Sequence, residues 1–316
     1  MGGCGESQDR QIGTLYTISH PSCLNPTRSK GSEGENMPRV SVLTPLYNTN
    51  PVHLREMIES ILNQTFTDFE FLILNDSPDN TEIEDIVKSY KDKRIKYSKN
   101  ERNMGITPSR NKLLKMARGE YIAIFDHDDI SVPTRLAQEV EFLDTHPHIG
   151  VVSGWLEYFG LGNNNILRTP EYDSAIRAHL TENCYVAHTA AMIRKSVLTA
   201  NNIEYEEFYT PAEDYRLWAR LMDVTHFHNL QTVLVRYRWF ENNTSKRMND
   251  MREEAAANIR WELSSKYPEY RLIASKLIVP GTRFRLRLFG FIPLLKIKNN
   301  WVLLFECIPL FKIKWK

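Results

Sequence analysis

Short runs of β-branched and aromatic residues alternate with helical patterns from residue 39 to residue 153. The strand-like runs lie at 39–44, 69–74, 94–98, 121–125 and 150–153, and helical patterns lie between them at 53–64, 83–90, 107–117 and 133–144. Strands that alternate with helices form βαβ units, in which the strands are mostly parallel. The sequence therefore predicts an α/β fold with a mixed, mostly parallel sheet flanked by helices.

The charge balance and the cysteines exclude several classes of protein. Of the 316 residues, 40 are Lys or Arg and 39 are Asp or Glu, so the formal net charge is +1. A chain with this balance is not a basic nucleic-acid-binding protein, and we expect no nucleic-acid partner. The four cysteines form no CxxC pair, which argues against a zinc ribbon or a disulfide scaffold. Because the sequence shows no apolar run of 18 residues and no secretory signal pattern, we expect a cytoplasmic protein.

Polar side chains follow three of the predicted strands at the point where each strand ends. Tyr47 and Asn48 follow the first strand, Asp76 follows the second, and the run Asp-His-Asp-Asp at 126–129 follows the fourth. Ligands of parallel α/β sheets bind at the carboxyl ends of the strands. The sequence therefore predicts a binding site at this edge of the sheet.

The run 126–129 places three carboxylates within four residues. Like charges so close repel one another, and a divalent cation offsets that cost. Mg²⁺ and Mn²⁺ prefer carboxylate oxygens and keep positions open for phosphate oxygens. We therefore expect a metal site here. A second interpretation is structural, in which Asp129 or Ser131 caps the helix predicted from Pro133.

The glycine-rich phosphate loops are absent from the sequence. The turn Pro45–Asn48 contains no glycine, which argues against a dinucleotide oxidoreductase and a P-loop kinase. A nucleotide can still bind where a metal holds its diphosphate. A Mg²⁺-dependent nucleotidyltransferase remains an alternative, although no glycine-rich loop with a following lysine lies near the first strand.

A second acidic pair, Glu213-Asp214, begins a predicted helix that contains Leu217, Trp218 and Leu221. Acidic residues in the first turn are stabilised by the helix dipole, which is the structural interpretation. The functional interpretation is a carboxylate base presented at a cleft, as a sugar hydroxyl nucleophile requires.

The segment 41–76 carries the first part of a known pattern. It begins SVLTPLYN, continues through a predicted helix that ends in SILNQT, and closes on a strand that ends in Asp76. This resembles the opening of the family 2 inverting glycosyltransferases, which have a Rossmann-like GT-A fold. Later motifs of that family match in order and spacing, namely Asn103-x-Gly105, Ser109-Arg110-Asn111, ARGEY at 117–121, Asp126-x-Asp128-Asp129, His188, RKS at 194–196, EDYxLW at 213–218 and Tyr237-Arg238. The resemblance covers residues 39–245.

The resemblance implies a role for each matched position. Residues implied to bind the nucleotide and the sugar are Pro45, Tyr47, Asn48, Asp76, Asn103, Gly105, Arg110 and Asp126. Asp76 would accept a hydrogen bond from uracil, and Arg110 would line the diphosphate, or alternatively pair with a carboxylate on a helix face. Asp128, with Asp126, would bind Mn²⁺ or Mg²⁺. Asp214 would be the general base and Glu213 would position the acceptor, with His188 and Trp218 on the acceptor side.

The implied reaction is a single displacement with inversion. A hexose or N-acetylhexosamine would move from a UDP-sugar to a hydroxyl of a lipid-linked, lipopolysaccharide or capsule glycan. The metal would neutralise the leaving diphosphate while Asp214 removes the acceptor proton. A non-catalytic nucleotide- or glycan-binding module is a further alternative, although intact Asp126, Asp128 and Asp214 argue against it.

One position departs from the family pattern. Relatives often have a histidine two residues after the Tyr-Arg pair, where this chain has Phe240. His188, His226 and His228 are possible substitutes, and each is equally explained as a packed, hydrogen-bonded histidine.

The C-terminal region contains a repeat. Residues 288–298 (LFGFIPLLKIK) recur at 304–314 (LFECIPLFKIK), and Arg283, Arg285 and Arg287 precede the first copy. Each unit is too short to span a bilayer, and apolar residues with Lys-x-Lys ends suit an anionic membrane interface. The alternative is a pair of hairpin-like strands or an oligomer contact. We expect peripheral attachment, through 283–316, to the inner face of the cytoplasmic membrane.

These patterns divide the chain into four parts. We expect a disordered leader over 1–36, a GT-A domain over 37–245 with a nucleotide-sugar half (37–150) and an acceptor half (151–245), a helical segment over 246–280, and an amphipathic tail over 281–316. Met37 directly precedes the first strand-like run, and is either the start of translation or an internal residue that follows a flexible leader.

Overall fold

The computed structural model describes residues 37–161, 165–240 and 249–276, and the backbone of four strands between residues 285 and 312. The predicted leader lies outside the described residues. The helices are α1 (Pro51–Leu62), α2 (Thr81–Ser89), α3 (Ile106–Met116), α4 (Arg135–Thr145), α5 (Asp173–Leu180), α6 (Lys195–Ala200), α7 (Glu213–Leu221), α9 (Asn249–Lys266) and α10 (Pro268–Lys276), with 3₁₀ turns η1 (His188–Ala190) and η2 (Glu207–Tyr209).

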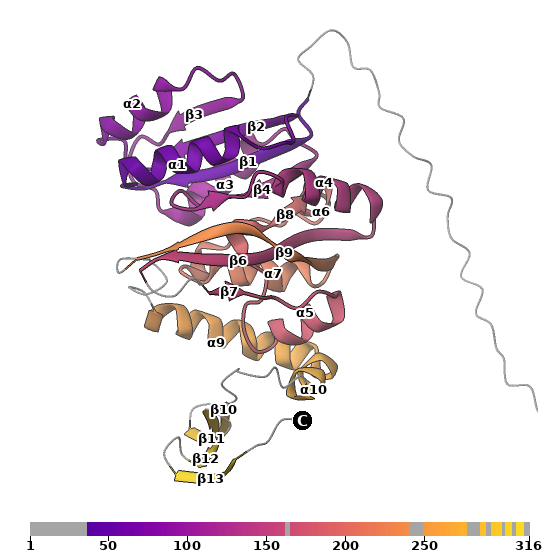
Figure 1. Ribbon diagram of the computed structural model, residues 1–316. Helices are drawn as coiled ribbons and strands as arrows, with labels where there is room; N and C mark the ends of the chain where they lie inside the picture. Colours follow the sequence, from indigo (N-terminus) through magenta and orange to yellow (C-terminus); the bar gives the residue numbers. More distant parts are fainter. Residues whose placement is uncertain are drawn as a thin grey trace, which may run out of the picture. The chain divides into compact units, whose positions relative to one another are not determined.

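One large sheet joins the first half of the chain to the second. Its strands are β1 (Val40–Leu46), β2 (Phe69–Asn75), β3 (Ile95–Lys99), β4 (Tyr121–Ile124), β5 (Ile130–Ser131), β6 (Ile149–Gly160), β7 (Ile166–Leu167), β8 (Met192–Arg194) and β9 (His226–Trp239), in the order β3-β2-β1-β4-β8-β6-β9-β5 with β7 beside β6 (Figure 1). Strands β1 to β4 are parallel, whereas β8 runs antiparallel to both β4 and β6. The predicted mixed, mostly parallel sheet is confirmed.

Two apolar layers cover the two faces of this sheet. Neighbouring residues of β1 belong to different layers. Val42 lies in the layer that includes residues of α1, α2 and α4, whereas Leu43 lies in the layer that includes residues of α3, α5 and α7. Such alternation follows from the two-residue period of a strand. The near-continuous apolar runs in the sequence therefore mark strands that are buried on both sides.

Local signals set where the helices begin. The Asn50 side chain accepts hydrogen bonds from the backbone N–H groups of Val52 and His53, and Pro51 occupies the first position of α1. Helix α3 begins at Ile106, directly after Gly105, whose φ of 91° favours glycine. The chain therefore turns into the helix at Gly105, and Thr107 is the second residue of the helix.

The C-terminal part changes from helices to strands. Helix α9 buries Ala256, Ile259 and Leu263, which agrees with the predicted helical segment. Beyond it, β10 (Arg285–Leu288), β11 (Ile292–Lys298), β12 (Trp301–Leu304) and β13 (Ile308–Lys312) form a separate antiparallel sheet. The repeat thus forms strands, as the alternative interpretation of hairpin-like strands predicted. The described residues of the expected helical C-terminal extension are helical only as far as α10.

The sequence repeat is also a repeat of backbone pairing. Arg285 pairs with Lys296 in the first hairpin, and Trp301 pairs with Lys312 sixteen residues later in the second. The register shifts between Leu286 and Arg287 in one hairpin, and at the equivalent place in the other. Among the described residues, no helix has the length and apolar character needed to cross a membrane.

Candidate active site

The carboxyl ends of β1 and β2 are tied together at one edge of the sheet. The backbone N–H of Asp76 donates to the carbonyl of Leu46 at 2.8 Å, and the N–H of Asn48 donates to Ser77 Oγ at 2.8 Å. Tyr47 is 52% exposed between these contacts. An aromatic ring held on a fixed turn, with half of its surface free, is suited to stacking on a planar ligand.

The carboxylate of Asp76 organises the loop before α3. Its two oxygens accept hydrogen bonds from the backbone N–H groups of Met104 and Gly105, both at 2.8 Å, and from the Asn100 amide at 2.7 Å. Asn103 Oδ1 also accepts from the Gly105 N–H at 3.0 Å. The structure thus brings Asp76, Asn103 and Gly105 together, and the Asp76 carboxylate has a structural role in holding this loop.

The three carboxylates after β4 have different surroundings. Asp129 is completely buried, where its oxygens accept from Thr189 Oγ1 at 2.8 Å and from the backbone N–H of Arg238 at 2.9 Å. Burial and the neighbouring Asp128 raise the pKa of Asp129 well above its ordinary value. Asp129 therefore pins the loop, and the expectation that it or Ser131 caps α4 is wrong, because that helix begins at Arg135 without a side-chain cap.

Asp128, together with Asp126 apart from its contact with Arg110, offers carboxylate oxygens to a ligand. No other residue of the described chain donates a hydrogen bond to the Asp128 carboxylate. Burial raises the pKa of Asp128, His127 opposes this rise, and the nearby charge of Asp126 adds to it. A cation would relieve this like-charge repulsion. No group of three or more His, Cys, Asp or Glu side chains among the described residues is arranged to hold a metal. The donor set therefore fits a divalent cation only if a ligand such as a diphosphate completes its coordination.

Helix α7 presents the second acidic pair. Glu213 is buried, and Asp214 accepts a hydrogen bond from the backbone N–H of Tyr215 at 2.7 Å. Burial raises the pKa of Asp214 to about 6, and Glu213 adds to the rise while Arg110 opposes it. A carboxyl group with a pKa near neutrality is matched to general-base chemistry.

The guanidinium of Arg110 joins these two acidic regions. It lies 2.5 Å from Glu213 Oε1 and 3.2 Å from Asp126 Oδ1. Burial opposes its positive charge, but Glu213 and Asp126 together raise its pKa above the ordinary value. The interpretation in which Arg110 pairs with a helix-face carboxylate therefore describes this structure, while its contact with a diphosphate stays a prediction.

One face of α3 holds the segment 205–213 that leads into α7. Thr107 Oγ1 lies 2.7 Å from Thr210 Oγ1, and the Asn111 side chain both donates to the Tyr205 carbonyl and accepts from the Tyr205 N–H. Together with Arg110, these residues occupy positions i, i+3 and i+4 of the helix, which share one face. Helix α3 therefore connects the edge of the sheet that carries Asp76 to the segment that leads into Asp214.

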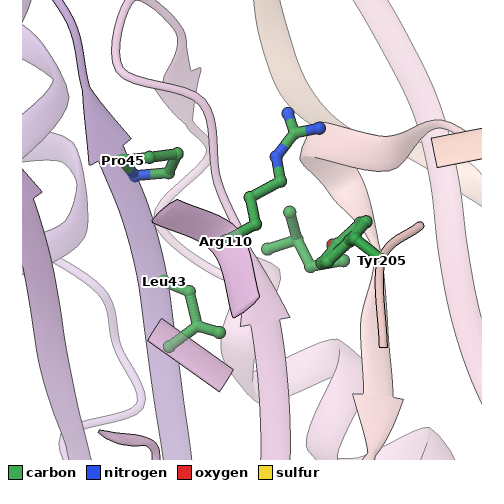
Figure 2. Close-up of a pocket in the computed structure, with 5 residues that line it drawn as sticks. Leu43, Pro45, Arg110 and Tyr205 are labelled. Carbon is green, nitrogen blue, oxygen red and sulfur yellow. The ribbon is translucent and has the colours of Figure 1, made fainter. Parts of the chain in front are cut away.

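A pocket lies beneath Arg110. It is a small pocket lined by Leu43, Pro45, Arg110, Ile124 and Tyr205. Figure 2 shows Leu43 and Pro45 on one side of the Arg110 side chain and Tyr205 on the other. The lining is almost wholly apolar, whereas the Arg110 guanidinium is bonded to Glu213 and Asp126.

The two residues expected on the acceptor side lie deeper than predicted. Trp218 is 0% exposed, so the expectation that it contacts the acceptor is corrected to a packing role beneath α7. His188 is also buried, and its Nε2 lies 2.9 Å from the Tyr205 hydroxyl. Burial lowers the pKa of His188 well below its ordinary value, which favours a neutral, packed histidine.

Sequence reasoning missed several residues that shape the site. One of them is Tyr205, which lines the pocket. Another is Thr189, whose hydroxyl accepts a hydrogen bond from the backbone N–H of Asp126 and donates one to the Asp129 carboxylate. Arg238 Nε donates to the Asp128 carbonyl at 2.7 Å. Only Arg238 had a signal in the sequence, because it belongs to the matched Tyr-Arg pair.

The surroundings of Phe240 show what lies near the missing histidine. The ring of His53, in the first turn of α1, packs against Phe240 with 5.9 Å between ring centroids. Burial lowers the pKa of His53, and Arg238 adds to this effect. His226 contacts Asp173 and His228 stacks on Phe142, so neither reaches the site through these contacts.

Comparison with known proteins identifies relatives. The family model described as glycosyl transferase family 2 matches residues 41–200. An uncharacterised glycosyltransferase of Methanocaldococcus jannaschii is 38% identical over 208 residues, which cover 64% of this chain and 71% of the relative. The amylovoran biosynthesis glycosyltransferase AmsE of Erwinia amylovora is 27% identical over 66% of this chain and 79% of its own.

Solved structures share the fold. TarS (residues 1–349) of S. aureus in complex with UDP-GlcNAc has a TM-score of 0.56 and 22% identity, over 77% of this chain and 76% of that one. The mannosyltransferase PcManGT of Pyrobaculum calidifontis, in complex with GDP-Man and Mn²⁺, has a TM-score of 0.51 and 15% identity, over 76% and 80% of the two chains.

Proposed function

The chain belongs to glycosyl transferase family 2 and has the GT-A fold, and from this we propose that it transfers a hexose or N-acetylhexosamine from a UDP-sugar to a hydroxyl of a lipid-linked or cell-surface glycan. The UDP-GlcNAc complex of TarS supports the donor class. The role of AmsE in amylovoran biosynthesis supports a surface polysaccharide as the acceptor class.

The arrangement around Arg110 carries this proposal. Its guanidinium contacts Asp126 at the end of β4 and Glu213 at the start of α7. Arg110 therefore contacts both Asp126, which is implied to face the donor, and Glu213, which directly precedes the implied base Asp214. A sugar bound between these two regions would lie within reach of both, as transfer in a single displacement requires.

In the proposed reaction, Asp214 accepts the proton of the acceptor hydroxyl while that oxygen attacks the anomeric carbon. The bond from the anomeric carbon to the diphosphate oxygen breaks in the same step, so the configuration inverts and an α-linked donor gives a β-linked product. Tyr47, on the turn after β1, would stack on the base, and Asp76 would accept from uracil. Glu213 would orient the acceptor.

Asp126 and Asp128 would hold a divalent cation. When bound, Mn²⁺ or Mg²⁺ would neutralise negative charge on the departing diphosphate. The Mn²⁺ complex of PcManGT supports this cofactor class. Arg238 would keep the loop in place, since its backbone N–H donates to Asp129 and its Nε donates to the Asp128 carbonyl.

We also propose that the repeat within 283–316 attaches the enzyme to an anionic membrane surface, on the cytoplasmic face. Each unit combines apolar residues with a Lys-x-Lys end. Both units form hairpins of equivalent backbone register, so two equivalent copies of this pattern lie in one sheet.

Donor binding tests the proposed function. Isothermal titration calorimetry with UDP-, GDP- and dTDP-sugars, with and without Mn²⁺, should show metal-dependent binding of one UDP-sugar. Asp128→Ala should abolish the metal-dependent part, whereas Asp85→Ala, on the exposed surface of α2, should not change it. Failure of every nucleotide sugar to bind would contradict the proposed function, and selective binding of a GDP- or dTDP-sugar would contradict the UDP assignment.

A further inference from the structure

The contact between Arg110 and Glu213 affects how tightly a nucleotide donor can bind, if the chain has the proposed function. Both side chains are largely buried, with 11% of Arg110 and 8% of Glu213 exposed. Arg110 also lines the pocket that begins at Pro45, on the donor edge of the sheet. The positive charge of the Arg110 guanidinium, which is implied to contact a diphosphate, is therefore already neutralised by Glu213 and Asp126.

We propose that the Glu213 carboxylate competes with a nucleoside diphosphate for the Arg110 guanidinium. The diphosphate must displace Glu213 from Arg110 in order to bind, and the displaced Glu213 is then free to bind the acceptor. Glu213 is thus a residue that sets donor affinity, in addition to its position beside the base.

The bonding of Glu213 supports an exchange of partners. Its Oε1 accepts from Arg110, whereas Oε2 is buried without a hydrogen-bond partner in the described part of the chain. A buried carboxylate oxygen without a donor is costly. Once Arg110 turns to a diphosphate, both oxygens of Glu213 need donors, and the hydroxyl groups of an acceptor sugar supply them.

The bonding of Arg110 supports the same exchange. Its Nε is buried without a partner among the described residues. Its contact with Asp126 is the longer of the two, at 3.2 Å against 2.5 Å for Glu213. A diphosphate offers several charged oxygens, and a guanidinium binds such groups through two parallel hydrogen bonds.

Removal of the Glu213 charge should therefore tighten donor binding. Apparent affinity falls with the fraction of protein that is competent to bind, so a guanidinium free for about one-tenth of the time weakens binding about tenfold. Glu213→Gln should bind UDP about tenfold more tightly than the wild type in the presence of Mn²⁺, as measured by calorimetry. A residue with only a structural role would not produce a gain in affinity.

Two further variants identify the cause of the gain. Glu206→Gln removes one charge from the same region, where Glu206 contacts Arg216 and Arg220, and should leave UDP affinity unchanged. In the double variant Arg110→Ala/Glu213→Gln, the gain should disappear relative to Arg110→Ala, because the effect of Glu213 acts through Arg110. If Glu213→Gln does not fold, Glu213→Asp takes its place in the experiment. This variant keeps the charge but shortens the side chain, and should give an intermediate gain in UDP affinity.

The outcomes separate this inference from the proposed function. Unchanged or weaker UDP binding by folded Glu213→Gln, with wild-type binding intact, overturns the inference and leaves the function standing. An equal gain in the Arg110→Ala background also overturns it, since the effect is then general electrostatics. Absence of UDP and GDP binding in the wild type and in both Glu213 variants overturns the proposed function and the inference together.

Discussion

The guanidinium of Arg110 lies 2.5 Å from a carboxylate oxygen of Glu213, although 103 positions of sequence separate the two residues. Arg110 belongs to α3, which packs on β1, and Glu213 begins α7. The contact therefore links the helix that packs on β1 to the helix whose second residue, Asp214, is implied to act as base.

Loss of the Asp214 carboxylate should abolish transfer but spare donor binding. An amide does not accept the acceptor proton, so Asp214→Asn should lower kcat by a factor on the order of 1,000. UDP-sugar binding by calorimetry should stay within about twofold of the wild type, a change of less than about 0.5 kcal/mol. Asp223→Asn, beyond the end of α7 where Asp223 pairs with Lys266, is the matched control. Retained transfer by Asp214→Asn would assign the base elsewhere.

The pH profile should report the same carboxyl group. The pKa of Asp214 is raised to about 6, so the base is protonated below this pH and active above it. We expect kcat/KM to rise with pH through about 6 and then to level off. Since Glu213 raises this pKa, Glu213→Gln should move the midpoint to lower pH. A profile that is flat from pH 5 to 7, or a midpoint unaffected by Glu213→Gln, would contradict the assignment.

Asp76 should matter both for stability and for the nucleotide. In Asp76→Asn, an amide nitrogen replaces an oxygen that accepts hydrogen bonds from the loop before α3. We expect the free energy of unfolding to fall by about 1–3 kcal/mol in urea denaturation, and UDP affinity to fall as well. Asp79→Asn, which is exposed in the same turn, should change neither. Normal UDP affinity in folded Asp76→Asn would show that the role is structural alone.

The ion pair between Arg135 and Glu139 should stabilise the strand end that carries the acidic loop. Both side chains are 0% exposed, and Arg135 also donates to the Ile124 carbonyl at 2.9 Å. Removal of one partner leaves a buried charge alone, so Arg135→Met should lower the free energy of unfolding by about 3–5 kcal/mol. The double variant with Glu139→Met should recover part of this loss.

A surface pair provides the control for that measurement. Glu84 and Lys88 have the same i,i+4 spacing on α2, with side chains 18% and 62% exposed. Lys88→Met should cost less than about 1 kcal/mol, because water screens the pair. Similar losses at the two sites would show that burial does not set the strength of the Arg135 pair.

Membrane attachment should depend on the lysines of the repeat. Each basic residue near an anionic surface contributes about 1 kcal/mol, so reversal of four charges should abolish co-sedimentation with phosphatidylglycerol vesicles. The variant replaces Lys296, Lys298, Lys312 and Lys314 by Glu. The control replaces Lys88, Lys91, Lys93 and Lys96, which lie outside the repeat. Equal loss in both variants, or binding to neutral phosphatidylcholine alone, would contradict a specific basic interface.

The sequence by itself determined the alternating strands and the edge of the sheet at which ligands are expected to bind. Runs such as 69–74 are apolar except for Glu70 because β2 is buried on both faces, a constraint that acts on each residue locally. The polar residues at strand ends mark where burial stops, so Asp76 and the run 126–129 were visible without coordinates. The ordered motifs also determined the family, because they are fixed in position along the chain.

Only the tertiary structure decided what each polar group does. Asp128 and Asp129 are adjacent in sequence, yet Asp129 is pinned by Thr189 and Arg238, which lie 60 and 109 positions away. Trp218 matched a motif but is completely buried. Hydrogen bonding and desolvation depend on neighbours brought together from distant parts of the chain, and no local pattern encodes them. For this reason the sequence located the acidic groups, whereas the fold divided them between structure and chemistry.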